Sequence, residues 1–319
     1  MKPALSIVFF TVSSGAGLGL LALGALADLF APGTLSARIE WRGALLGVAL
    51  VGAGLAASVL HLANPRNAWR SFARFGTSWL SREAVFAVAL FPVAGIYTII
   101  LATEAVSGWR TFFALATMVF AWAVLLSTAM IYASLKPIRQ WRTPWTPVNY
   151  LLLGHWSGAL LLLATASAYA APPRRWFALA LALGAAALAA KLAYWFSIGM
   201  GTKGSFTLER AIGVDQGVHG PGPMSVAQAR LLEVGHSHGT FLTKEFVFTL
   251  ARRYAIALRA VAIVLGFGLP FAWLISDSAR WQPGLGAAVC CIIGLLAERW
   301  LFFAEARHTV RLYHGDPST

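Results

Sequence analysis

Eight long apolar stretches constrain the fold of this chain more than any other feature. Each has about the 20 residues that an α-helix needs to cross the hydrocarbon core of a bilayer. Charged residues make up only 12% of the chain, about half the fraction usual in a soluble domain. The sequence therefore predicts an all-α membrane protein with eight transmembrane helices in the lipid bilayer. The predicted spans are residues 4–27, 43–63, 84–103, 111–135, 148–170, 176–198, 250–275 and 284–304.

The basic residues lie mostly in the segments between these spans. Seventeen of the Lys and Arg residues fall on the side of the two termini and six on the opposite side, while Lys191 and Arg259 lie within spans. We expect these two to snorkel toward the side of the termini. Because cytoplasmic loops carry the excess of Lys and Arg, both termini are predicted to be cytoplasmic, in a bacterial inner membrane. The net charge of +13 is then explained by lipid headgroups and membrane insertion, and we expect no nucleic-acid partner.

A short motif occurs twice, before the third span and before the seventh. Residues 76–86 read GTSWLSREAVF, and residues 239–248 read GTFLTKEFVF. Four spans return a chain to its starting side, so the motif indicates two parallel four-helix repeats. The predicted repeats are residues 1–145 and 146–319, the second with a long basic loop at 199–249.

Polar residues are densest between the end of the second span and the start of the third. A histidine titrates near neutrality, and burial shifts a carboxyl group toward the same range. Such a pair can accept the two protons that a quinol releases on oxidation. We predict His61 and Glu83 as proton acceptors; the predicted quinol-binding residues are His61, Asn64, Pro65, Arg66, Arg70, Ser81 and Glu83.

These residues also have an interpretation without chemistry. His61 can bond a free carbonyl group at the end of its helix. Ser81 is expected to be the N-cap of the third helix, with Glu83 in the first turn, where the helix dipole favours an anion. The choice between a site and a helix cap stays open at this point.

Other polar residues support weaker hypotheses. His155 and His308 could face His61 and ligate a single b-type haem. Pro92 and Pro270 interrupt related spans, which is a feature of secondary transporters with a midplane site. Both alternatives, a single-haem cytochrome anchor and a transporter, remain open.

Metal binding is not predicted. The cysteines Cys290 and Cys291 are adjacent, so on a helix they point in different directions and form neither a disulfide nor an iron–sulfur site in this chain. Glu298 and Arg299 are expected to form an ion pair facing the interior of the bundle.

Four segments resemble the membrane anchor subunits of DMSO reductase-type molybdoenzymes (DmsC-like). They are the opening MKPALSIVFFTVSSGAGLGL, the H-L-x-N-P of residues 61–65, the WLSRE of residues 79–83 and the ERWLFF of residues 298–303. The resemblance implies a haem-free subunit that binds menaquinol or ubiquinol. It also implies electron transfer to a four-cluster iron–sulfur subunit, which feeds a molybdenum catalytic subunit. The quinol-site histidine and carboxylate of that family fall on His61 and Glu83.

Overall fold

The structure is a computed structural model, which describes residues 3–60, 62, 64–104, 108–169, 173–201, 250–276, 281–309 and 312. Eight of its helical spans are long and apolar enough to cross a membrane, so the prediction of an eight-helix all-α fold is confirmed. The uninterrupted helices are α1 (Leu5–Phe30), α2 (Ala37–Val59), α3 (Trp79–Ala102), α4 (Gly108–Ala133), α5 (Trp145–Ser167), α6 (Arg174–Gly201) and α11 (Trp281–Ala304). The seventh span consists of α9 (Leu250–Ile263), the π-helical segment η3 (Val264–Gly268) and α10 (Leu269–Ile275).

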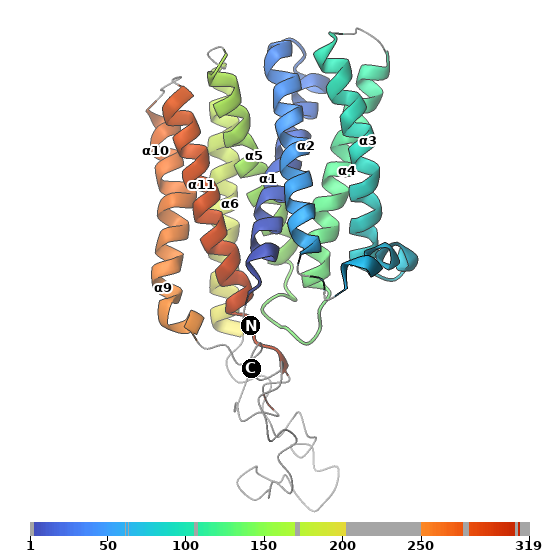
Figure 1. The fold of residues 1–319 in the computed structure, drawn as a ribbon. Coiled ribbons are helices and arrows are strands. Elements are labelled where there is room, and N and C mark those ends of the chain that lie inside the picture. The colour runs from blue at the N-terminus through green and yellow to red at the C-terminus, as the bar shows by residue number, and fades with distance from the viewer. Residues whose placement is uncertain are drawn as a thin grey trace, which may run out of the picture.

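The helices run side by side as one bundle (Figure 1). Helices α1 and α5 occupy the centre, with α2, α3 and α4 on one side and α6, α9, α10 and α11 on the other. Helix α1 packs against α2, α4, α5 and α11. We call the end of the bundle where α1 begins and α11 ends the terminus-side end, and the opposite end the far end.

Glycines allow the two central helices to approach closely. Gly19 of α1 lies against Gly154 and Gly158 of α5, and the two α5 glycines have the four-residue spacing of small residues at membrane helix contacts. A Cβ atom on Gly19 would collide with the carbonyl group of Gly154, and one on Gly158 would collide with the backbone of Gly19. The backbones of α1 and α5 are therefore in direct contact.

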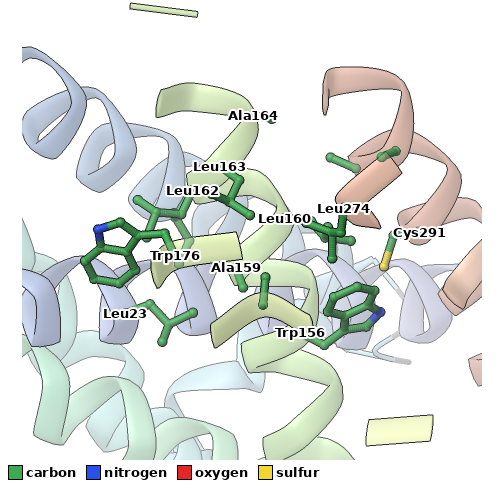
Figure 2. Close-up of a cluster of buried hydrophobic side chains, with 14 of the residues drawn as sticks. Leu23, Trp156, Ala159, Leu160, Leu162, Leu163, Ala164, Trp176, Leu274 and Cys291 are labelled. Carbon is green, nitrogen blue, oxygen red and sulfur yellow. The ribbon is translucent and has the colours of Figure 1, made fainter. Parts of the chain in front are cut away.

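The seventh span is irregular near its middle. The π-helical turn ends at Gly268, two residues before Pro270, which has no N–H to donate. The carbonyl oxygen of Gly266 in this turn accepts a hydrogen bond of 2.9 Å from Trp156 Nε1 of α5. Figure 2 shows Trp156 in the buried apolar cluster that joins α1 and α5 to α6, α10 and α11. The irregular turn is thus supported by a neighbouring helix, as non-helical backbone in a membrane requires.

A short 3₁₀-helix, η1 (Pro65–Arg74), connects α2 to α3 at the terminus-side end. A 3₁₀-helix has three residues per turn, so side chains three apart share a face. Trp69 and Phe72 share such a face, and both are exposed. The connection between α2 and α3 therefore presents aromatic side chains at the end of the bundle.

Candidate functional site

A cleft of about 880 Å³ opens between η1 and helices α1–α4. Its volume is in the range of small-molecule sites. Most of its wall is apolar and comes from several helices, including Ile7, Phe10, Leu55, Val59, Leu80 and Val88. Trp69 and Phe72 of η1 add aromatic surface, and the polar side chains are few.

Glu83 supplies the acidic group of the cleft. The residue lines the cleft but is only 5% exposed. The Thr128 hydroxyl of α4 donates a short hydrogen bond to Glu83 Oε1. Thr128 Oγ1 also lies 2.9 Å from the carbonyl oxygen of Val124. Among the described residues, no ion pair joins Glu83 to a basic side chain. A buried carboxyl group with one hydroxyl partner is therefore presented to an apolar cleft.

The other predicted site residues divide into two groups. Asn64 and Arg70 line the same cleft as Glu83. Pro65 and Arg66 are exposed on η1 and do not line it. His61 lies outside the described residues.

Ser81 does not have the role expected from the sequence. Helix α3 begins at Trp79 instead of residue 84, and its N-cap is Ser78, whose hydroxyl accepts a hydrogen bond from the Ser81 N–H. Ser81 is buried, and its own hydroxyl accepts a 3.2 Å hydrogen bond from the backbone N–H of Arg74. The prediction of Ser81 as N-cap and of Glu83 in the first turn is wrong. Because α3 starts earlier, Glu83 lies deeper in the helix and its carboxyl group faces α4.

At the far end, a partly buried ion cluster was not predicted from the sequence; the Arg110 side chain is 26% exposed. Arg110 binds Asp28 at 2.7 Å and Glu40 at 2.8 Å, and Tyr97 donates a 3.0 Å hydrogen bond to Asp28. The four residues come from α4, α1, α2 and α3, so the cluster joins all four helices. The sequence signal was present, because Asp28 and Glu40 flank the apolar parts of two successive spans.

A second buried ion cluster lies in the other half of the bundle. Lys191 of α6 is 1% exposed and forms an ion pair with Glu298 of α11. The prediction that Lys191 snorkels to the surface is therefore wrong, because a buried carboxylate holds its ammonium group inside. The expected contact between Glu298 and Arg299 is present at 3.5 Å, and both residues are buried.

One further ion pair lies beside this cluster. Arg259 of α9 contacts Glu305, which follows α11, at 2.7 Å. Burial raises the pKa of Glu305, and the neighbouring Arg259 opposes that rise.

His155 is not placed to ligate a haem. Its Nε2 atom accepts a 2.9 Å hydrogen bond from Trp122 Nε1, and its Nδ1 atom lies 2.7 Å from the carbonyl oxygen of Leu151. Both ring nitrogens are engaged by protein groups in a neutral imidazole. The geometry does not support the haem hypothesis at this residue.

Comparison with known proteins places the chain in a family. Residues 1–304 match the family model of the DMSO reductase anchor subunit (DmsC). The chain is 34% identical to the C component of sulfite dehydrogenase from Allochromatium vinosum over 337 aligned positions, covering 98% of this chain and 99% of that protein. It is 33% identical over 113 residues to the C component of anaerobic dimethyl sulfoxide reductase from Escherichia coli K12, covering 35% of this chain and 39% of that protein. With a family model across nearly the whole length and a full-length relative above 30% identity, this chain belongs to the DMSO reductase anchor subunit family.

Proposed function

We propose that the cleft at the terminus-side end is a quinol-oxidising site, with Glu83 and His61 as the proton acceptors. Membership of the family makes the chain a membrane anchor subunit of a molybdoenzyme complex. In the proposed role, electrons from the quinol pass to an iron–sulfur subunit with four clusters and then to a molybdenum catalytic subunit. The observation that carries the proposal is the buried carboxyl group of Glu83 on the wall of a large apolar cleft.

The chemistry of a quinol matches the composition of this cleft. Its ring hydroxyls must lose two protons as two electrons leave, so they need acceptors within hydrogen-bonding distance. Glu83 provides one acceptor. Val59 and Leu62, on either side of His61 in the sequence, both line the cleft, which supports His61 as the other. The apolar wall suits the hydrocarbon tail of menaquinol or ubiquinol.

Arg70 and Asn64 add polar contacts near the mouth of the cleft. We assign them to binding of the quinol ring. Arg66, Pro65 and Ser81 support the site through the fold of η1 and the start of α3.

The transporter hypothesis is less well supported. A transporter of this kind needs polar groups near the middle of the membrane. Among the described residues, Asp28, Glu40 and Arg110 gather at the far end, and Glu83 lies close to the terminus-side end. Lys191 and Glu298 lie deeper within their spans, but they form an ion pair with each other. Family membership also favours the anchor over a transporter.

The orientation and partners complete the proposal. The excess of Lys and Arg on the side of the termini supports an orientation in a bacterial inner membrane with that side in the cytoplasm. The basic segments on that side are the proposed docking platform for the soluble subunits. Of these segments, η1 lines the cleft, and the connection between α4 and α5 lies at the same end of the bundle (Figure 1).

Substitution of Glu83 tests the proposed function. In the purified complex, Glu83→Gln keeps the size of the side chain and removes the proton acceptor. General acid–base participation typically contributes about 10²–10⁴-fold to a rate. We therefore expect quinol-dependent turnover to fall at least about 100-fold, and the same for His61→Gln. Electron delivery from an artificial dye directly to the soluble subunits should remain normal, because it bypasses the cleft.

Glu104→Gln is the matched control. Glu104 is exposed just beyond the other end of α3, so the same substitution there should leave quinol turnover unchanged. Normal quinol turnover in an assembled Glu83→Gln complex would exclude Glu83 as a proton acceptor and contradict the proposed site.

A further inference from the structure

Thr128 contacts Glu83 from α4. It is 4% exposed, lies on α4 and is not part of the cleft wall. Its hydroxyl group is within hydrogen-bonding distance of two acceptors, Glu83 Oε1 and the carbonyl oxygen of Val124, the latter at 2.9 Å. A threonine hydroxyl has one proton to donate and two lone pairs that accept. It can therefore donate to only one of these oxygens at a time.

The protonation state of Glu83 decides which arrangement forms. When the carboxyl group is ionised, the Thr128 hydroxyl donates to it. When Glu83 carries a proton, the acid O–H donates to Thr128 Oγ1, and the Thr128 hydroxyl turns to the carbonyl oxygen of Val124. In both arrangements every proton donor has an acceptor. A buried polar group left without a partner is costly, and neither state leaves a donor in that condition.

We propose that Thr128 is a positioning residue that lets Glu83 take up and release a proton inside the bundle. This inference rests on the proposed quinol site. Thr128 holds the carboxyl group against α4, facing the cleft, and its hydroxyl rotates as the proton arrives and leaves. The residue does not contact the substrate; it acts through Glu83.

Few groups around Glu83 compete with it as the source of a pH effect. Among the described residues, the titratable or charged side chains facing it are Tyr132 of α4 and Arg70 of η1, both in the cleft wall, and Tyr150 of α5. Histidine titrates near neutrality, so His61, the other proposed proton acceptor, can also contribute to the rate profile, and the infrared band of Glu83 identifies a shift as its own. Tyrosine and arginine ordinarily titrate near pH 10 or above, outside the range of the assay. The described cleft residues of α1 and α2 are not titratable, being Ile7, Phe10, Leu55, Ser58 and Val59.

The pH dependence of quinol turnover in the purified complex tests this role. Thr128→Val has nearly the same shape but no hydroxyl, so the ionised form of Glu83 loses its donor. The carboxylate then becomes available as a base only at higher pH. Hydrogen bonds to charged groups are strong enough to move a titration midpoint by about one unit or more. We expect the acid limb of the pH–rate profile to move upward by that amount, and Thr128→Ser to restore it.

A spectroscopic measurement makes the test independent of turnover. The infrared band of the protonated Glu83 carboxyl group, identified by its loss in Glu83→Gln, should titrate at higher pH in Thr128→Val and near the normal pH in Thr128→Ser. Suppose that Thr128→Val lowers turnover equally at every pH and leaves the titration midpoint of the infrared band unchanged. Thr128 would then have only a packing role. A Thr128→Ser variant that behaves like Thr128→Val would lead to the same conclusion.

The outcomes also separate this inference from the proposed function. If Glu83→Gln abolishes quinol turnover while Thr128→Val leaves the profile and the band unmoved, the quinol site stands and the role of Thr128 is refuted. If Glu83→Gln retains turnover, the quinol site itself fails.

Discussion

Lys191 and Glu298 form a buried ion pair that joins α6 to α11. Both side chains are 1% exposed, and the Lys191 ammonium group also lies 4.3 Å from the centre of the Tyr194 ring. Breaking a buried pair by removing one partner typically costs about 3–5 kcal/mol, because it leaves an uncompensated charge inside the protein. This pair should therefore be important for the stability of the second half of the bundle.

We predict that Lys191→Met lowers the free energy of unfolding by about 3–5 kcal/mol. Methionine fills a similar volume, so the lost charge dominates the effect. The measurement is unfolding of the purified protein in mixed micelles, followed by tryptophan fluorescence. The double variant Lys191→Met with Glu298→Gln should recover part of the loss, since it removes the buried carboxylate that has lost its Lys191 partner and keeps only the 3.5 Å contact with Arg299. Wild-type stability of Lys191→Met alone would contradict the assignment.

At this scale the sequence identified Glu83 but not its surroundings. A carboxyl residue near the end of an apolar stretch is visible in any sequence, and in the structure Glu83 lines a cleft; its role as a site residue stays a prediction. The helix that carries Lys191 is apolar on all sides, so its sequence has no periodic pattern that shows which face points into the bundle. Lys191 was therefore expected at the surface. For the same reason the sequence does not single out Thr128. Its importance depends on the packing of α3 against α4, which brings it next to Glu83.

At the scale of the secondary-structure elements, the packing at the centre of the bundle depends on the contact between α1 and α5. Membrane helices gain no hydrophobic stabilisation from one another relative to lipid, so close packing of their surfaces provides much of the attraction. The glycines at this contact let the two backbones touch. The G-x-x-x-G spacing is readable from the sequence, but the choice of partner helix is not, because several other helices also carry small residues.

We predict that Gly19→Ala destabilises the bundle by about 1–3 kcal/mol, the usual cost of forcing extra volume into a packed contact. The added methyl group meets the backbone of α5, and a backbone cannot rotate away as a side chain can. Thermal unfolding of the full-length protein in detergent measures the effect. Gly95→Ala on α3 is the control, because a Cβ atom there has no neighbour within 4 Å; alanine also favours a helix over glycine. Equal melting temperatures for the two variants would count against direct backbone contact.

The ends of the helices were the least accurate part of the prediction. Helices α2 and α3 begin at Ala37 and Trp79, several residues before the predicted apolar stretches at 43 and 84. Hydropathy follows the hydrocarbon core, whereas the backbone hydrogen bonds of a helix continue into the interfacial region. Here that difference changed an assignment, since it moved the N-cap of α3 from Ser81 to Ser78.

At the scale of the whole molecule, the packing supports the proposal of two four-helix repeats, residues 1–145 and 146–319. The pairs α1–α2, α3–α4 and α1–α4 are all in contact, and so are their counterparts α5–α6, the seventh span with α11, and α5–α11. Helices α1 and α5 lie at the centre of the bundle (Figure 1), where an axis relating the two proposed repeats would have to pass. The second copy of the motif, with Glu245, lies outside the described residues. An experimental structure whose halves do not superpose by rotation about that axis would refute the repeat.

The same packing ties the orientation of the chain to the side on which the cleft opens. Glu83 and η1 lie at the end where α1 begins and α11 ends, so the cleft faces whichever compartment holds the termini. Seventeen of the Lys and Arg residues lie on that side and six on the other. The positive-inside rule therefore predicts that the side of the termini is cytoplasmic. Protons that Glu83 accepts from the quinol would then be released into the cytoplasm.

We predict that a green fluorescent protein fused after Thr319 fluoresces in cells and that alkaline phosphatase fused there is inactive, because phosphatase folds only in the periplasm. Phosphatase fused after Pro173, in the connection between α5 and α6, should be active, because that connection lies at the far end. The paired fusions control for expression, since each site is read with both reporters. Active phosphatase after Thr319 together with a fluorescent fusion after Pro173 would show that the chain has the opposite orientation in the membrane. The cleft and its basic segments would then face the periplasm, and the soluble subunits would have to dock there.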